Sequence, residues 1–443
     1  MSISPTAIWA DPARYWEGLT AAIADRPAPC AVLEVSAYAH NRDDLVRRIA
    51  RARRDAGRSG KLPIRVASKS LRVRDLVTGL AGAGEMAGAD GAARADGVTG
   101  VAGESGSEGY AGVLAFTLAE ANWLADHGLT DVVVGYPSAD RGALRALAAG
   151  EGRARAVTVM IDSVDQLDLI DQVIAPTNRP EIRVALEVDV SLRLPGLRVG
   201  VYRSPLRTPA QVRALAEEID RRPGFRLVGL MAYEAQIAGL GNRASGSAPQ
   251  RARTAAIAAL QARSIPQIAE IRQAAVAAVA AVAELEFVNG GGTGSIESTA
   301  ADPSVTEVAA GSGLFGPALF DHYRAFRPAP AAAFALDVVR RPTADIATVL
   351  GGGWIASGPP EASRQPVTTW PPGLAYVAEE MAGEVQTPLR HAAELQVGDR
   401  VWFRHAKAGE LSDHAPTLLL VDAASASVVG EVATYRGEGQ AFL

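Results

Sequence analysis

The chain has 443 residues, 48% of them hydrophobic, and a net charge of −5. Length alone suggests about three domains, although a barrel can account for roughly 250 residues by itself. No basic stripe stands out, which argues against nucleic acid as the main partner. Cys30 is the only cysteine, which excludes an intrachain disulfide and a cysteine-based zinc site. The N-terminus has no signal-peptide pattern and no apolar run could span a membrane, so we expect a cytoplasmic protein.

Short apolar runs alternate with helical patterns from residue 30 to residue 326. Continuous apolar strands of this kind are typical of parallel sheets that are buried on both faces. Strand–helix alternation repeated eight times predicts a (β/α)8 barrel over residues 30–326, with a doubly wound open sheet as the alternative. The runs are 31–35, 64–68, 112–116, 131–135, 157–161, 183–190, 227–233 and 285–289.

Three of the intervening segments begin with residues that fit a capping box: Thr117 with Glu120, Ser163 with Gln166, and Thr208 with Gln211. One segment differs, because residues 79–111 are mostly small or charged. We expect a flexible insertion there.

Beyond residue 326 the helical period disappears, and apolar runs are separated by Gly, Pro and polar turns. This pattern predicts an antiparallel β domain over residues 327–443. We expect the first 29 residues to form an N-terminal segment that packs on this β domain.

Residues at the carboxyl ends of barrel strands are the candidates for chemistry. Lys69 follows the second run, where partial desolvation would make its amine a better nucleophile. Taken alone, a lysine at a strand end is more often an ordinary snorkelling side chain.

Two glycine-rich turns lie near the last predicted strand, at 289–295 and 309–316. Such turns let backbone N–H groups converge on an anion, and barrels often bind phosphate there. The candidate phosphate ligands are Gly292, Thr293, Gly294, Gly311 and Ser312.

Polar residues end the sixth and seventh runs: Asp189, Arg193, Arg198, Tyr233 and Glu234. An arginine at such a position can bind a carboxylate through two parallel hydrogen bonds. A salt-bridged loop is the equally simple alternative.

Together these motifs resemble the fold-type III enzymes that use pyridoxal 5′-phosphate (PLP), the alanine racemase family. Within it, the chain is similar to the D-threonine aldolase and D-serine dehydratase branch. The resemblance rests on Lys69, the element 198–201, the loop 289–294, and residues 306–308 leading into Gly311 and Ser312.

The resemblance implies a PLP barrel with a β domain, usually as a homodimer. Lys69 would hold PLP as a Schiff base and move protons at Cα, and PLP would accept the electrons of the carbanion. It places Arg198 and Tyr233 with the cofactor, and Arg193 and Glu234 with the substrate.

Members of that branch carry a metal site in the β domain, a His followed two residues later by Asp or Cys. His405 matches the histidine, but Lys407 stands at the second position, and an ammonium has no lone pair. Two alternatives follow. In the first, a shifted divalent-metal site is formed by His405 with Glu410, Asp413 or His414. In the second, the Lys407 ammonium replaces the metal beside the substrate β-oxygen, and His405 acts as acid or base.

The expected reaction is therefore aldol cleavage or dehydration with deamination of a β-hydroxy-D-amino acid of the D-threonine or D-serine type. One alternative is an amino acid racemase, but the usual β-domain segment with its catalytic tyrosine is not recognisable. The other is a non-catalytic PLP-binding protein, although the small barrels of that class lack the β domain.

Overall fold

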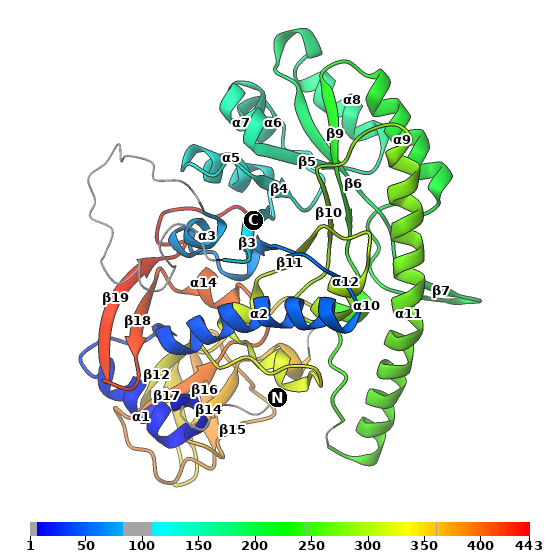
Figure 1. Ribbon diagram of the computed structural model, residues 1–443. Coiled ribbons are helices and arrows are strands. Elements are labelled where there is room, and N and C mark those ends of the chain that lie inside the picture. Colours follow the sequence, from blue (N-terminus) through cyan, green and yellow to red (C-terminus); the bar gives the residue numbers. More distant parts are fainter. Residues whose placement is uncertain (1–6, 83–107, 245, 360) are drawn as a thin grey trace.

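The computed structural model describes residues 7–82, 108–244, 246–359 and 361–443, which form a barrel and a separate sheet (Figure 1). Eight parallel strands close the barrel in the order β10-β11-β2-β3-β4-β5-β6-β9. This confirms the predicted barrel and excludes the open sheet. The strands are β2 (Ile64–Ala67), β3 (Tyr110–Ala115), β4 (Val132–Val134), β5 (Val157–Ile161), β6 (Ile182–Glu187), β9 (Phe225–Ala232), β10 (Phe287–Gly290) and β11 (Glu307–Ala310).

The predicted membership of the barrel is wrong by one strand at each end. β1 (Cys30–Glu34) lies in the other sheet, antiparallel to β12 (Ala332–Arg340) and parallel to β18 (Thr417–Asp422). β11, which leads into the second glycine-rich turn, closes the barrel instead. β1 shows the same continuous apolar pattern as a barrel strand because its sheet is also covered on both faces.

Helices surround the barrel on its outside (Figure 1). They are α2 (Val35–Asp55), α3 (Arg74–Ala81), α5 (Leu118–Asp126), α6 (Arg141–Ala148), α7 (Glu151–Ala156), α8 (Val164–Val173), α9 (Pro209–Arg221), α11 (Ala248–Ala280) and α12 (Ile296–Ala301). Two short helices, α10 (Ala235–Ala238) and α13 (Ser312–Phe315), follow the carboxyl ends of β9 and β11. Complete capping boxes begin α8 and α9, as predicted. At α5 the box is incomplete: Thr117 accepts from the Glu120 N–H, but the Glu120 carboxylate accepts from the Phe116 N–H and the Tyr435 hydroxyl.

Both ends of the predicted insertion, 79–111, belong to regular elements instead. Its first residues end α3, and Tyr110 begins β3. Residues 83–107, which make up most of it, lie outside the described residues.

The second sheet has nine strands and confirms the predicted C-terminal β domain. Besides β1, β12 and β18 it contains β13 (Ala347–Leu350), β14 (Val367–Trp370), β15 (Ala375–Tyr376), β16 (Gln386–Arg390), β17 (Arg400–Arg404) and β19 (Ser427–Ala433), and α14 (Glu410–His414) precedes β18. Helix α1 (Pro12–Ala22) packs on this sheet through Tyr15, Trp16 and Leu19, which share a core with Trp402 and Leu419.

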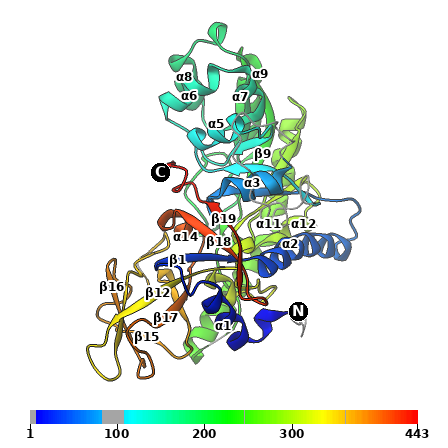
Figure 2. The same cartoon turned by 90° about the vertical axis from the view of Figure 1, so that its left-hand side faces the viewer.

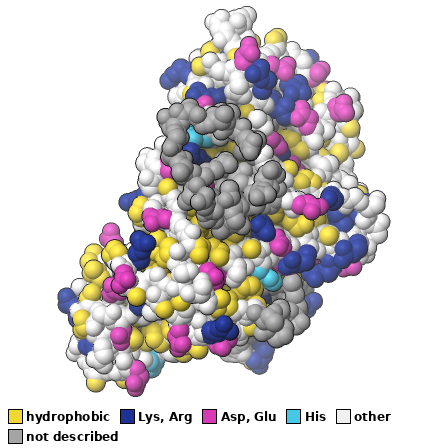
Figure 3. All heavy atoms as spheres, turned by 60° about the vertical axis from the view of Figure 1, so that its left-hand side comes forward, with side chains coloured by type: hydrophobic (Ala, Val, Ile, Leu, Met, Phe, Trp, Pro, Cys, Tyr) yellow, Lys and Arg dark blue, Asp and Glu magenta, His cyan; other side chains and the backbone are white. Residues whose placement is uncertain are grey.

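Figure 2 shows the barrel above and the second sheet below, with β1 in the lower part and α2 extending from it beneath the barrel. Among the described residues, no helix combines the length and apolarity needed to cross a bilayer. Basic and acidic side chains are mixed over the face in Figure 3.

Candidate active site

A cavity of about 320 Å³ lies at the carboxyl ends of the barrel strands and is completed by the β domain. The barrel supplies residues that follow β2, β4, β6, β9, β10 and β11. The β domain supplies Arg364, Lys407 and Ala408. Parallel strands end at the same rim of a barrel, so residues distant in sequence meet here.

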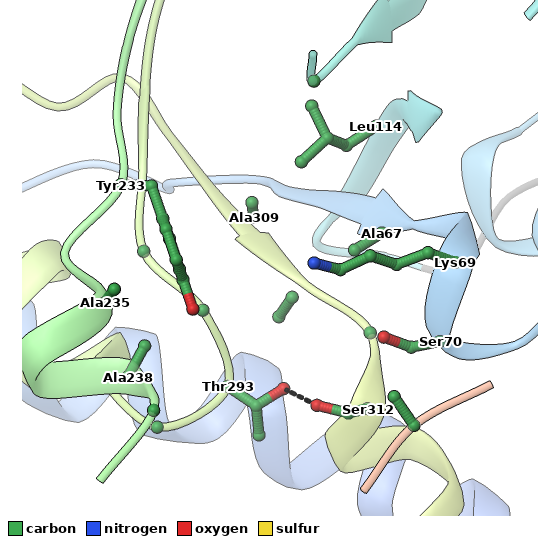
Figure 4. Close-up of a pocket in the computed structure, with 18 of the residues that line it drawn as sticks. Ala67, Lys69, Ser70, Leu114, Tyr233, Ala235, Ala238, Thr293, Ala309 and Ser312 are labelled. Atoms are coloured by element: carbon green, nitrogen blue, oxygen red, sulfur yellow. Dashed lines mark hydrogen bonds between the residues drawn. The ribbon is translucent and has the colours of Figure 1, made fainter. Parts of the chain in front are cut away.

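Lys69 extends into this cavity from a 3-10 turn, Ser68–Ser70, directly after β2 (Figure 4). Its Nζ donates a hydrogen bond to the Tyr136 hydroxyl over 3.0 Å. Burial acts to raise the pKa of the Tyr136 phenol. The charge and hydrogen bond of Lys69 and the charge of Arg203 act in the opposite direction and outweigh burial, so the pKa is lowered. The two groups therefore form a coupled amine–phenol pair in a partly desolvated site.

Arg203 links the two tyrosines of the cavity. Its Cζ lies 5.1 Å from the centre of the Tyr136 ring and 5.0 Å from that of Tyr233. Glu187 lies 3.7 Å from the guanidinium, and burial raises the pKa of that carboxyl to about 7 although Arg203 acts against this shift.

Sequence reasoning missed Tyr136 and Arg203. Tyr136 directly follows the fourth predicted strand, so the expectation that functional residues lie at the carboxyl ends of barrel strands would have identified it.

The two glycine-rich loops lie against each other beside Lys69. Thr293 Oγ1 accepts a hydrogen bond from Ser312 Oγ (3.3 Å, drawn in Figure 4) and another from the Gly313 N–H (3.1 Å). A Cβ on Gly294 would lie 2.5 Å from the Ala238 carbonyl oxygen, and one on Gly311 would lie 2.5 Å from that of Ala67. Only glycine permits such close approach of these backbones. Together with Gly292 the loops form a concave, hydroxyl-lined cradle, which fits a phosphate group.

Tyr233 also lines the cavity and faces the Lys69 amine across it (Figure 4). Of the predicted residues, the structure thus brings together Lys69, Tyr233, Lys407 and the five phosphate-loop residues.

Three other predicted residues do not line the cavity. Arg193 and Arg198 belong to the hairpin of β7 (Leu192–Leu194) and β8 (Leu197–Val199), where both pair with Asp189 at 2.8 and 3.4 Å. Glu234 is buried beneath the glycine loop, where it accepts from the Gly291 N–H over 2.7 Å and pairs with Arg272 over 2.9 Å. All three side chains are thus engaged in local ion pairs outside the cavity wall.

The proposed metal ligands do not converge. His405 is fully buried against Phe315 and is absent from the cavity wall. Glu410 accepts the backbone N–H groups of Lys407 and Ala408, and Asp413 pairs with Arg72. The described part of the chain contains no cluster of three or more His, Cys, Asp or Glu side chains that could hold a metal ion.

His414 stacks on Trp354 with ring centres 5.2 Å apart, so it too is engaged elsewhere. The structure therefore does not bring His405 to the cavity: its ring packs against Phe315, and both ring nitrogens are buried without a hydrogen-bond partner. Of the segment 404–414, Lys407 and Ala408 reach the cavity.

His405 should instead make stability depend on pH. Burial, and then the charge of Arg404, lower its pKa from 6.5 to about 3. Between these values the unfolded chain binds a proton that the folded chain does not, so stability falls as pH is lowered through this window. Each pH unit removes up to about 1.4 kcal/mol of the free energy of unfolding. Urea unfolding at about pH 6.5 and about pH 4.5 should show a steeper loss for the parent than for His405→Leu. Equal losses in both proteins would contradict this assignment.

Comparison with known proteins places these features in a family. Residues 91–318 match the model of the alanine racemase N-terminal domain. The fold is similar to that of D-threonine aldolase from Filomicrobium marinum, with 19% identity, a TM-score of 0.70, and 94% of this chain and 96% of that chain covered. It is also similar to D-threo-3-hydroxyaspartate dehydratase from Delftia sp. HT23, with 18% identity, a TM-score of 0.62, and coverage of 92% and 97%.

An alanine racemase-like protein from Idiomarina loihiensis matches with 14% identity, a TM-score of 0.64, and coverage of 93% and 98%. No curated protein matches the sequence. These structural likenesses show the fold. The family model covers more than half of the chain, and the chain therefore belongs to the alanine racemase N-terminal domain family, whose members are PLP-dependent enzymes.

Proposed function

We propose that this protein is a PLP-dependent lyase that cleaves or dehydrates a β-hydroxy-D-amino acid. The observation that carries the proposal is the placement of the Lys69 amine in a strand-end cavity beside a glycine cradle. An amine and a phosphate-sized cradle on one wall are what covalent attachment of PLP requires. When bound, PLP supplies an electron sink for negative charge that develops at the substrate α-carbon.

The chain's own residues then have distinct tasks. Gly292, Thr293, Gly294, Gly311 and Ser312 would hold the phosphate, and the Tyr233 ring would contact the cofactor. Lys69 is placed to move a proton at Cα, and Tyr136, hydrogen-bonded to it, is placed to exchange that proton with Lys69. Arg203 keeps both tyrosine rings in position.

We rank a lyase before a racemase because the usual β-domain segment with the racemase tyrosine is not recognisable in the sequence. A racemase needs a second base on the opposite face of Cα, for which the family uses a tyrosine of the β domain. Among the described β-domain residues, those that line this chain's cavity are Arg364, Lys407 and Ala408, and none of them is a tyrosine. Tyr435 is engaged with Glu120 instead. Lys407 lines the cavity and would be the positive partner of a β-oxygen.

Lys407→Met should lower kcat for a β-hydroxy-amino acid by roughly 100-fold or more, because a positive charge that stabilises the β-oxygen is lost. Cofactor retention should stay at the parent's level, since the glycine cradle is unchanged. Lys407→Arg, which keeps the charge, should recover part of the activity. We also expect the parent to keep its activity in a chelator. Activity that disappears with the chelator and returns with a divalent ion would contradict the role of Lys407.

The proposed function is tested by incubating the PLP-loaded protein with D- and L-threonine, serine and alanine. Aldehyde, ammonia and inversion of configuration should be measured separately. Release of aldehyde or ammonia from the D-β-hydroxy substrates supports the proposal, inversion of alanine supports a racemase, and bound PLP without any turnover supports a carrier. We further propose a homodimer, which light scattering on the purified protein tests.

A further inference from the structure

Two positive side chains of the β domain line the cavity without a carboxylate partner. Lys407 Nζ donates to the carbonyl oxygen and the hydroxyl of Ser357, over 3.3 and 3.2 Å. Arg364 ends the 3-10 turn Ala362–Arg364, and its Nε is buried with no hydrogen-bond partner. Within the described part of the chain, neither cation has a carboxylate oxygen within 4.0 Å.

The two cations flank a single turn. Lys407 is bonded to Ser357, and a Cβ on the next residue, Gly358, would lie 2.7 Å from Arg364 Nε. Lys407 and Lys69 line the same cavity. Burial, followed by the charges of Arg364 and Lys69, lowers the pKa of the Lys407 ammonium. Three positive side chains thus line one cavity, Lys69 from the barrel and Lys407 and Arg364 from the β domain.

No acidic residue compensates these charges inside the cavity, since none of the lining residues that the structure describes is Asp or Glu. Glu410, close in sequence, is directed at the backbone N–H groups of Lys407 and Ala408. A partly desolvated guanidinium without a counter-charge is unfavourable, and an anionic ligand removes this penalty. The glycine cradle is built by loops of the barrel and Arg364 comes from a turn of the β domain, so the phosphate and a second anion would have different partners.

We propose that Arg364 binds a carboxylate on the substrate side chain, so that the enzyme prefers β-hydroxy amino acids with an acidic side chain. This inference rests on the proposed function, which puts the α-carbon at Lys69. The β-oxygen then meets Lys407, and the carboxylate beyond it meets Arg364. A guanidinium can hold such a carboxylate through two parallel hydrogen bonds.

Binding of unreactive acids tests this without any turnover. D-malate and D-lactate lack the amino group, and D-malate carries the second carboxylate. Calorimetry on the PLP-loaded protein should show D-malate binding about tenfold or more tightly than D-lactate, the scale expected for one charge-assisted hydrogen-bonded pair. Arg364→Met should remove this difference, and Arg364→Lys should keep part of it. The control is Arg390→Met, which replaces an exposed cation at the end of β16 and should leave the difference unchanged.

Turnover gives the second test. The ratio of kcat/KM for D-threo-3-hydroxyaspartate to that for D-threonine should fall at least about tenfold in Arg364→Met. Equal affinity of the parent for both acids would overturn the proposal. An Arg364→Met variant that binds both acids more weakly by the same factor would also overturn it, because Arg364 would then bind the α-carboxylate. So would a variant that loses only PLP affinity, because Arg364 would then bind the phosphate. If D-malate binds through Arg364 but no amino acid reacts, the carboxylate site stands and the proposed reaction fails.

Discussion

Replacing Lys69 with alanine is expected to abolish covalent cofactor attachment and to reduce turnover by roughly a thousandfold or more, because one amine both attaches the cofactor and moves the proton. The sequence contains three lysines, Lys61, Lys69 and Lys407. Borohydride reduction of the PLP-loaded parent followed by peptide mapping should therefore find the pyridoxyl group at Lys69 and not at the other two.

Two controls make this result specific. Lys69→Arg keeps a positive charge beside Tyr136 but cannot attach the cofactor, so it should be as inactive as Lys69→Ala. Lys61→Ala alters an exposed lysine that pairs with Glu108 on the surface, so it should behave like the parent. In Lys69→Ala the pKa of Tyr136 should rise, because burial acts without the lysine charge, and ultraviolet titration can follow this change. A label on Lys61 or Lys407 would refute the proposed function.

The second large effect is expected for Gly294→Asp. A side chain at this position would meet the Ala238 carbonyl at 2.5 Å and the Tyr323 ring at 2.6 Å, and its carboxylate would lie beside the phosphate dianion. PLP affinity should fall by roughly 3 kcal/mol, which is more than about 100-fold. Titration of the unloaded protein with PLP measures this directly.

Gly294→Ala separates the two causes, because it adds the close contact without the charge and should lose less affinity than Gly294→Asp. Gly152→Asp is the matched control, since a Cβ there meets nothing within 4 Å. Circular dichroism shows whether each variant still folds. A folded Gly294→Asp protein with the PLP affinity of the parent would place the phosphate elsewhere.

The sequence by itself determined the fold class and the heart of the site. Continuous apolar runs indicate strands buried on both faces, and their number and spacing predict a barrel and a β domain. The strand-end rule then singled out Lys69, Tyr233 and the two glycine loops. The structure confirms the barrel and the β domain and brings these residues to one cavity, because each depends on local features: a run of residues, its end, and the turn that follows it. The chemical roles of these residues stay predictions.

The tertiary structure alone decided which sheet each strand joins and which charges face the cavity. β1 resembles a barrel strand because burial on both faces leaves the same apolar pattern in either sheet. The arginines at 193 and 198 and the acid at 234 carry the right chemistry, but local ion pairs engage them. His405 occupies a family motif position, yet its ring is buried in packing.

Tyr136, Arg203 and Arg364 become part of the site through contacts between residues far apart in the chain. Their partners are set by how the barrel closes and how the β domain meets its rim. A sequence pattern carries information on neighbours along a strand or helix. These three side chains contact residues of other elements, which the pattern does not specify.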